Sequence, residues 1–189
     1  MDLLPTPSQT VGPYFSLGMA WLTVTDLAKD ATTGERIVVA GCVWDGDAKP
    51  IPDAILEVWQ ANSSGKYAHP DDPQDKAIDP GFTGFGRIPT DTEGRFRFVT
   101  IKPGATPGSQ NTLQAPHIAV TLFMRGLGRQ LSTRIYFSDE PANAEDPILG
   151  RIQEPARRET LIARRIAGTN EYRWDIRMQG ENETVFFDC

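Results

Sequence analysis

The stretch that decides the fold lies in the second half of the chain and reads Ala115-Pro116-His117-Ile118-Ala119-Val120-Thr121-Leu122-Phe123-Met124-Arg125-Gly126. Its alternation predicts a β-strand after the proline, with Ile118, Val120 and Leu122 on one face. A histidine at the start of such a strand can ligate a metal, and a His-x-His pair would offer two imidazoles from one face. Here the second position is Ala119, whose methyl group cannot coordinate anything. The strand therefore has the form of a metal-site scaffold that lacks a ligand.

Runs with the same strand pattern lie on both sides of this stretch. The runs that we expect to form strands are residues 37–44, 54–60, 95–101, 117–124, 130–137, 172–178 and 184–187. Gly126-Leu127-Gly128 predicts a hairpin turn between two of them. Six or seven strands with turns rich in Gly and Pro predict an all-β protein with a β-sandwich fold.

Helical patterns are sparse. Pro147 suits the first position of a helix, so we expect a short helix over residues 146–152. Residues 155–165 are compatible with a helix or a strand, and we favour a strand after Thr160.

Two segments extend beyond a compact sandwich. Residues 1–30 are rich in Pro, Thr, Ser and Gly, so we expect an N-terminal arm that contacts a partner subunit, followed by a single sandwich domain over residues 31–189. Residues 61–92 form a loop of about 30 residues, and loops beyond about 15 residues are usually functional or disordered. Its aromatic residues Tyr67, Phe82 and Phe85 predict that this loop is ordered.

The composition excludes several classes of function. The net charge of −6 argues against nucleic acid as a partner, because phosphate binding needs a basic face. Cys42 and Cys189 do not make a disulfide framework. Residues 1–5 do not resemble a signal peptide, and no apolar run approaches the roughly 20 residues of a membrane span. We therefore expect a cytoplasmic protein.

The residues that could carry chemistry are few. The histidines are His69 and His117, and neither has zinc-ligand spacing. The glycines at 81, 84 and 86 do not form a nucleotide-binding fingerprint, because they neither follow a strand nor open a helix. The residues alone do not provide a complete catalytic set.

A family resemblance emerges from the order of short motifs. The sequence has LEVWQAN at 56–62, GKY at 65–67, GFGR at 84–87, TIKPG at 100–104 and PHI at 116–118. These follow one another as in the intradiol aromatic-ring dioxygenases, and TPSQTVGPY at 6–14 and ETVFFD at 183–188 extend the match. The chain resembles this family over nearly its whole length.

The resemblance implies a specific ligand set. The family binds non-haem Fe(III) with two tyrosines and two histidines. Tyr67 and His117 match the first tyrosine and the first histidine, whereas the other two positions hold Thr106 (or a neighbour) and Ala119. The chain therefore resembles the iron-free α subunit of heteromeric members, in which a β chain holds the Fe(III) and the α chain completes the substrate pocket in an (αβ)n assembly. We expect no metal ligand and no catalytic residue in this chain.

The resemblance also implies substrate-binding residues. They are Gly12 and Pro13 in the arm and Arg125 in the FMRG run. The implied substrate is 3,4-dihydroxybenzoate, which O2-dependent intradiol cleavage converts to 3-carboxy-cis,cis-muconate. A guanidinium is always charged and can align a planar carboxylate. A glycine before a rigid proline ring lets the backbone approach a flat ring closely.

Each of these residues also has a simpler interpretation. A lone strand histidine such as His117 is usually a hydrogen-bonded core residue, and Tyr67 is usually structural. An arginine at a hairpin end usually forms a surface salt bridge. The alternative function is a non-catalytic β-sandwich that serves as a binding or carrier module and has lost the enzyme site. Retention of SQTVGPY, FMRG and ETVFFD together favours the enzyme subunit.

Overall fold

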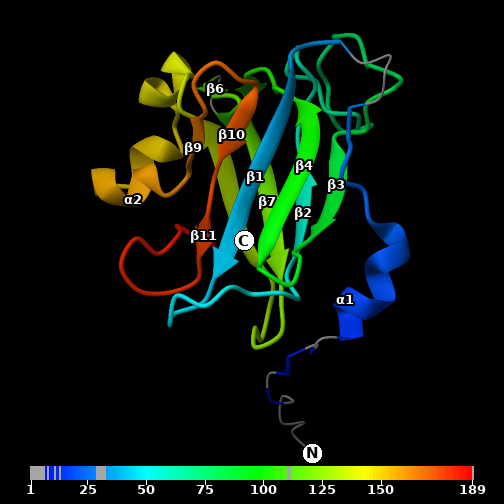
Figure 1. The fold of residues 1–189 in the computed structure, drawn as a ribbon. Coiled ribbons are helices and arrows are strands. Elements are labelled where there is room, and N and C mark those ends of the chain that lie inside the picture. The colour runs from blue at the N-terminus through cyan, green and yellow to red at the C-terminus, as the bar shows by residue number, and fades with distance from the viewer. Residues whose placement is uncertain are drawn as a thin grey trace, which may run out of the picture.

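The computed structural model describes residues 7, 9–10, 12, 14–28, 33–109 and 112–188, and most of its regular structure is strand (Figure 1). The longer strands are β1 (Arg36–Trp44), β2 (Ile55–Trp59), β3 (Phe85–Pro89), β4 (Arg95–Ile101), β7 (His117–Phe123) and β8 (Leu131–Phe137). The shorter ones are β5 (Thr106–Pro107), β6 (Leu113–Gln114), β9 (Ile162–Arg165), β10 (Glu171–Arg173) and β11 (Ile176–Arg177). The helices are α1 (Tyr14–Met19), η1 (Ala20–Leu22), η3 (Pro141–Glu145), η4 (Leu149–Arg151) and α2 (Pro155–Glu159).

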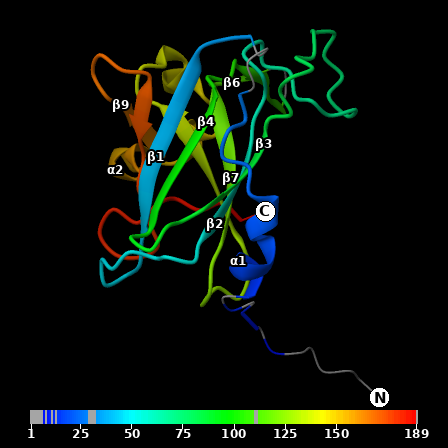
Figure 2. The same cartoon turned by 45° about the vertical axis from the view of Figure 1, so that its right-hand side comes forward.

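All strands except β5 and β6 form two layers that β9 connects (Figures 1 and 2), and β5 pairs with β6 in a separate two-stranded sheet. One layer pairs β4 with β1, and β1 in turn pairs in parallel with β10 and β11. The other layer has the order β8-β7-β2-β3, with antiparallel pairing throughout. The first half of β9 pairs with β8 and its second half pairs with β10. A strand that changes sheet in this way is a corner of a β-sandwich.

The core lies between the two layers and follows the alternation of the strands. Ile118, Val120 and Leu122 of β7 are almost fully buried, as the period-two pattern predicts. They pack in one cluster with side chains of the opposite layer, among them Val39 of β1 and Phe98 of β4. Full burial of such a side chain contributes roughly 1.5–3 kcal/mol. The expected β-sandwich is confirmed.

Two of the expected strands differ from the structure. The run at 172–178 is split into β10 and β11, because the Asp175 carboxylate accepts a hydrogen bond from the Cys42 amide at 2.9 Å where a ladder bond would stand. The run at 184–187 is no strand, and only Phe187 makes a bridge, to Ser132.

The expected helix over residues 146–152 is mostly wrong. Only the single turn of η4 forms there, because the Asp146 carboxylate accepts hydrogen bonds from the amides of Ile148 and Leu149 at 2.8 and 2.9 Å. Further along the chain, α2 ends at Glu159 and β9 begins at Ile162, so the expected strand after Thr160 is confirmed.

The N-terminal segment contains helix that the pattern did not predict. Helix α1 and the turn η1 lie on the outside of the sandwich (Figure 1), and Leu17 and Trp21 on them are exposed. Leu27 and Ala28 are buried in the core, which attaches the segment to the domain. The division of the chain at residue 30 and the role of the arm in subunit contact remain predictions. None of the helices among the described residues is long and apolar enough to cross a membrane.

Candidate functional site

The four positions that the sequence singled out as a former metal site, Tyr67, Thr106, His117 and Ala119, are called the pseudo-site below. His117 and Ala119 lie on the face of β7 that points away from the core. Loop residue Tyr67 and Thr106 of β5 both lie next to this face, as the contacts described below indicate.

His117 is a buried, neutral residue. Its side chain is 4 % exposed, and Nδ1 donates a hydrogen bond to the Ala115 carbonyl at 2.8 Å. Burial, together with the positive charge of Arg134, lowers the pKa of the imidazole from 6.5 to about 4. The ring packs at 5.8 Å from the ring of Tyr136, which lies opposite His117 on β8. This arrangement matches the interpretation of His117 as a hydrogen-bonded core residue.

Tyr136 and Asp146, which accepts a hydrogen bond from the Tyr136 hydroxyl, form the buried end of this face. The Tyr136 hydroxyl donates to the Asp146 carboxylate at 3.2 Å, and burial followed by that negative charge raises the pKa of the phenol. Asp146 is 2 % exposed and also accepts hydrogen bonds from the amides of Ala115, Ile148 and Leu149. The carboxylate thus joins the backbone at Ala115 and the turn at 148–149 to the side chain of Tyr136 on β8.

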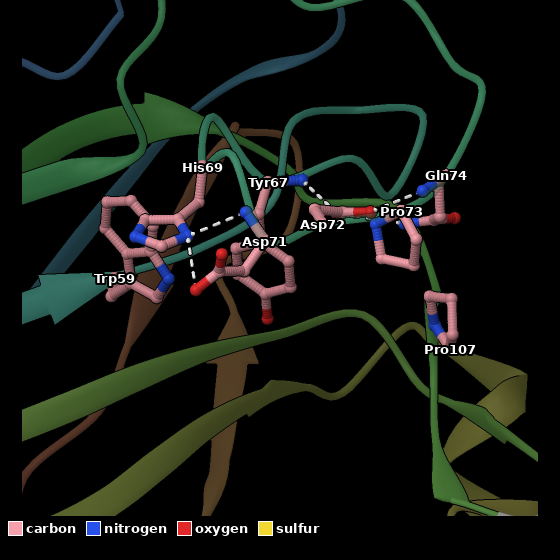
Figure 3. Close-up of a pocket in the computed structure, with 8 residues that line it drawn as sticks. All are labelled: Trp59, Tyr67, His69, Asp71, Asp72, Pro73, Gln74 and Pro107. Atoms are coloured by element: carbon pink, nitrogen blue, oxygen red, sulfur yellow. Dashed lines mark hydrogen bonds and ion pairs between the residues drawn. The ribbon is translucent and has the colours of Figure 1, made fainter.

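Tyr67 forms one wall of a pocket. Its ring stacks on Trp59 at a centroid distance of 5.9 Å, and burial raises the pKa of its phenol. The pocket has a volume of about 310 Å³ and is lined by Trp59, Tyr67, His69, Asp71, Asp72, Pro73, Gln74 and Pro107. Figure 3 shows Trp59 and His69 on one side, Pro107 on the other, and the phenol of Tyr67 between them.

The carboxylates at this pocket are already compensated or exposed. Lys66 lies 3.3 Å from Asp72, and both side chains are buried. Burial alone would raise the pKa of Asp72, but hydrogen bonds from Gln74, Tyr67 and Lys66 together lower it to about 2. Asp71 is 92 % exposed and lies 3.7 Å from His69.

Thr106 and Arg134 complete the surroundings of the pseudo-site. The Thr106 hydroxyl is buried and makes no hydrogen bond of normal geometry, although it lies near enough to Tyr67 to favour the ionised phenol slightly. Arg134 pairs directly with Ala119 across the β7–β8 ladder, so both side chains lie on the same face. Its guanidinium donates to Gln114 Oε1 at 2.5 Å.

The side chains at the pseudo-site do not match an Fe(III) site. The family resemblance implies two phenolates and two imidazoles as ligands, and this chain offers a neutral hydroxyl at Thr106 and a methyl group at Ala119. Arg134 adds a positive charge to the same face, which opposes a trivalent cation. Within the described part of the chain, no group of three or more His, Cys, Asp or Glu is arranged to hold a metal ion.

The second candidate region lies beyond the other end of β7 and is called the arm–turn site, consisting of Thr10, Gly12, Asp53, Arg125 and Gly126. The Thr10 hydroxyl accepts hydrogen bonds from the amides of Gly126 at 3.0 Å and Gly12 at 3.3 Å. The arm is thereby tied to the β7–β8 turn. Gly12 and Gly126 have φ values of +64° and +87°, a backbone region that favours glycine.

Arg125 is exposed and anchored from one side. Its side chain is 59 % exposed, and Nε lies 3.3 Å from Asp53 Oδ2. The Asp53 side chain is only 13 % exposed, and within the described part of the chain neither of its oxygens makes a hydrogen bond. The structure therefore brings Arg125 and Gly12 into one region through Thr10, as a shared substrate-binding role requires. Pro13 lies outside the described residues.

Comparisons with known proteins identify the family of the chain. A family model described as a dioxygenase matches residues 11–180. The chain belongs to the intradiol dioxygenase family. It is 44% identical to the protocatechuate 3,4-dioxygenase alpha chain of Pseudomonas putida, over 100% of this chain and 98% of that protein. It is 43% identical to the protocatechuate 3,4-dioxygenase beta chain of Burkholderia cepacia, over 84% of this chain and 73% of that protein.

Solved structures of the family have the same fold. The dioxygenase domain of a carbohydrate-binding fusion from Streptomyces sp. SirexAA-E has a TM-score of 0.62 and 28% identity, and the match covers 96% of this chain and 100% of that one. Catechol 1,2-dioxygenase from Acinetobacter sp. ADP1 has a TM-score of 0.64 over 80% of this chain and 55% of that one, at 22% identity. The second likeness shows the fold alone.

Sequence reasoning missed three residues of these regions. Arg134 belongs to the pseudo-site only because of the strand register, and Asp53 belongs to the arm–turn site only because of the path of the loop before β2. Thr10 could have been predicted from the sequence, because it stands in the SQTVGPY motif two residues before Gly12. A hydroxyl next to a glycine that needs positive φ is a common turn device.

Proposed function

We propose that this chain is the iron-free α subunit of a protocatechuate 3,4-dioxygenase and completes the substrate pocket of an iron-bearing β chain. In the proposal the assembled enzyme uses O2 to cleave 3,4-dihydroxybenzoate between its two hydroxyl carbons, which gives 3-carboxy-cis,cis-muconate. The Fe(III) belongs to the β chain of an (αβ)n assembly. A cytoplasmic location is part of the proposal and rests on the use of cysteine, since Cys42 is a buried free thiol.

The observation that carries this proposal is the identity of residues 106 and 119. Overall identity alone does not separate the two kinds of chain, because it is 44% to an alpha chain and 43% to a beta chain. Coverage favours the alpha chain, since the match spans 98% of that protein against 73% of the beta chain. Thr106 and Ala119 cannot supply the two missing Fe(III) ligands, which supports the α assignment.

Within the proposal, the arm–turn site is the part of this chain that reaches the substrate. Arg125 would hold the substrate carboxylate, because Nε faces Asp53 and, among the described residues, the outer nitrogens have no ion-pair or hydrogen-bond partner. Gly12 and Pro13 would line the flat face of the ring. The exposure of Arg125 suits a pocket that a second subunit completes.

Co-expression with a candidate β chain tests the proposal. The candidate β chain should contain a His-x-His sequence in the corresponding strand and both tyrosine ligands. We expect the purified complex to contain iron, to absorb visible light through tyrosinate-to-iron charge transfer, and to consume O2 with 3,4-dihydroxybenzoate. The controls are each chain purified alone. The proposal is wrong if the β chain is equally active without this chain, or if this chain alone binds stoichiometric Fe(III).

A further inference from the structure

A cavity on the outer face of the layer that contains β1, called the α2 cavity below, shares no lining residue with the pocket of Figure 3. It lies between helix α2, strands β9 to β11 and the loop that follows β11. Figure 1 shows α2 and that loop on the same side of the sandwich, next to β9 and β10. The volume of about 290 Å³ is at the small end of the range for ligand pockets.

Strand alternation places three arginines in the lining of the α2 cavity. Ile176 is fully buried in the core, so Arg177 beside it lies on the outer face of the sheet. Arg173 of β10 and Arg164 of β9 line the same cavity and are direct cross-strand partners. Like charges in such a position destabilise a sheet unless carboxylates compensate them.

Two of the three arginines are compensated within the cavity. Arg164 forms an ion pair with Glu159 of α2, and Arg173 lies 3.0 Å from Asp175. Asp175 also accepts a hydrogen bond from the Cys42 amide at 2.9 Å, so the backbone of β1 holds this carboxylate in place. Both carboxylates of the lining are therefore already engaged.

Arg177 is the arginine of the cavity that lacks a counter-charge. Among the residues that the structure describes, no carboxylate lies within 4.0 Å of its guanidinium, and the guanidinium makes no hydrogen bond. Its backbone is fixed, because its amide donates to Thr184 Oγ1 and its carbonyl accepts from the Thr184 amide, both at 2.9 Å. The residue is partly buried. A guanidinium in such surroundings favours an anion as its partner.

The lining indicates which class of anion fits. Three guanidiniums and two carboxylates leave one net positive charge, which matches a monoanion and not a phosphate dianion. Ala156 and Ile162 add aliphatic hydrocarbon to the lining. Trp174 also lines the cavity, but it is 3 % exposed and its Nε1 donates to the Thr160 carbonyl at 2.9 Å, so its ring offers no face for stacking.

We propose that the α2 cavity binds a small aliphatic monocarboxylate. The planar carboxylate pairs with the guanidinium of Arg177, and the hydrocarbon chain lies against Ala156 and Ile162. The proposal goes beyond the proposed function and does not rest on it. Arg177 belongs to the layer of β1, whereas Arg125 follows β7 in the other layer.

NMR titration of butyrate, observed through its methyl resonance, tests the proposal on the purified αβ complex and on the full chain alone. Arg177→Gln should weaken butyrate binding at least tenfold, because it removes a charge-assisted pair. Arg97→Gln is the matched control and should leave the affinity unchanged. Arg97 is exposed on β4 and likewise has no ion pair within the described part of the chain. Equal affinities in the two variants would overturn the proposal.

Related small molecules test the class of ligand. Neutral butyramide should bind at least tenfold more weakly than butyrate, and equal binding would overturn the role of the charge. Acetate as tight as butyrate would overturn the role of the hydrocarbon chain. Inorganic phosphate that binds more tightly than butyrate, and loses its affinity in Arg177→Gln, would overturn the assignment to a monocarboxylate.

A pair of variants on α2 keeps the test valid if Arg177→Gln does not fold. Ala156 is exposed in the first turn of α2, so both Asp and Asn can be placed there. Ala156→Asp brings a further carboxylate into the lining and should weaken butyrate binding severalfold, whereas the isosteric Ala156→Asn should leave it unchanged. The same affinity in both variants would contradict the proposal.

A neighbouring subunit is the other source of a carboxylate. Such a group would fill the α2 cavity only in the assembled complex, whereas a site for a free ligand stays open there. We expect butyrate to bind the complex and the chain alone with similar affinity. Binding by the chain alone and not by the complex would overturn the site for a free ligand and assign Arg177 to a subunit contact.

Discussion

The pseudo-site and the arm–turn site lie at opposite ends of β7 and are built in opposite ways. At the pseudo-site, His117 is buried, neutral and hydrogen-bonded within its own chain, and the neighbouring Tyr136 and Asp146 are buried as well. At the arm–turn site, Arg125 is 59 % exposed, and the Thr10 hydroxyl ties the start of the arm to the β7–β8 turn. The enclosed region serves the stability of the chain, whereas the open region is suited to a partner and a ligand.

Removal of the buried Asp146 carboxylate, beside the pseudo-site, should have the largest effect, which is a loss of stability. Asp146→Ala leaves three backbone amides and the Tyr136 hydroxyl without an acceptor, and each buried unsatisfied donor costs about 1–3 kcal/mol. At the lower figure the four donors together cost about 4 kcal/mol, so we expect the melting temperature of the purified complex to fall by about 8–16 °C, because 1 kcal/mol corresponds to about 2–4 °C at this chain length.

Asp45→Ala is the matched control for that change. Asp45 also accepts two backbone amides, from Asp47 and Lys49, but in an exposed turn where water can replace it. A loss of stability in Asp45→Ala as large as in Asp146→Ala would remove the contrast between enclosed and open regions.

The pH dependence of stability should report on His117. Its pKa is about 4 in the folded chain and 6.5 when unfolded, so the unfolded state binds more protons between these values. Stability is therefore complete above pH 6.5 and falls by roughly 3 kcal/mol as the pH drops to 4. Urea unfolding across this window measures the loss, and His117→Asn should flatten it.

His69→Asn provides the control, because His69 is the other histidine of the chain and its side chain is half exposed. The carboxyls of Asp72 and Asp139, whose pKa values are lowered from 3.8 to about 2, lose their contribution mainly below about pH 5, so the upper part of the window, from pH 5 to 6.5, reports on His117. An unchanged slope in His117→Asn would mean that the buried imidazole is not the titrating group.

At the arm–turn site, a substitution should change the substrate affinity of the complex and leave its stability unchanged. Arg125→Ala removes the charge that would hold the substrate carboxylate, so the KM of the complex for protocatechuate should rise about tenfold or more. Catechol lacks the carboxylate and should keep its KM. Arg129→Ala, in the same turn and paired with exposed Asp188, is the control. Equal losses with both substrates would make Arg125 a structural residue.

The smallest effect should come from the residue that orients Arg125. Asp53→Asn removes the charge 3.3 Å from Nε, and partly exposed ion pairs contribute about 0.2–1 kcal/mol. We expect the KM for protocatechuate to rise by less than about fivefold and the melting temperature to stay unchanged. In the double variant with Arg125→Ala the effect should vanish, because Asp53 acts through Arg125. Additive losses would refute that dependence.

Much of the fold followed from local alternation, and the misses have local causes. Residues 95–101 and 117–124 read as strands because one face is apolar; the first run is β4 in full, and the second is β7 as far as Phe123. The run at 172–178 reads the same way, but the Asp175 side chain takes a backbone partner that the alternation cannot reveal. Similarly, Asp146 replaces a predicted helix by a side-chain-bonded turn.

The sequence predicted which residues stand at the metal-ligand positions of the candidate site. It did not predict which side chains lie next to them. The substitutions at 106 and 119 stand out once the motifs are aligned by order along the chain. Arg134 could not be found in this way, because a shift of one residue in the β7–β8 register would place it on the core face. The ion pair of Asp53 with Arg125 likewise depends on a loop path that has no periodic signal.

The parallel pairing of β1 with β10 and β11 has a consequence for how the chain folds. The hydrogen bond from Cys42 to Asp175 joins residues 133 positions apart, and β1 is buried along nearly its whole length. Closure of so long a loop is entropically costly, and chains dominated by such contacts fold slowly. During synthesis, β1 has an unpaired edge until the last twenty or so residues emerge, and exposed strand edges promote aggregation. The C-terminal end therefore completes the sandwich, and its loss should be far more damaging to folding than loss of the arm.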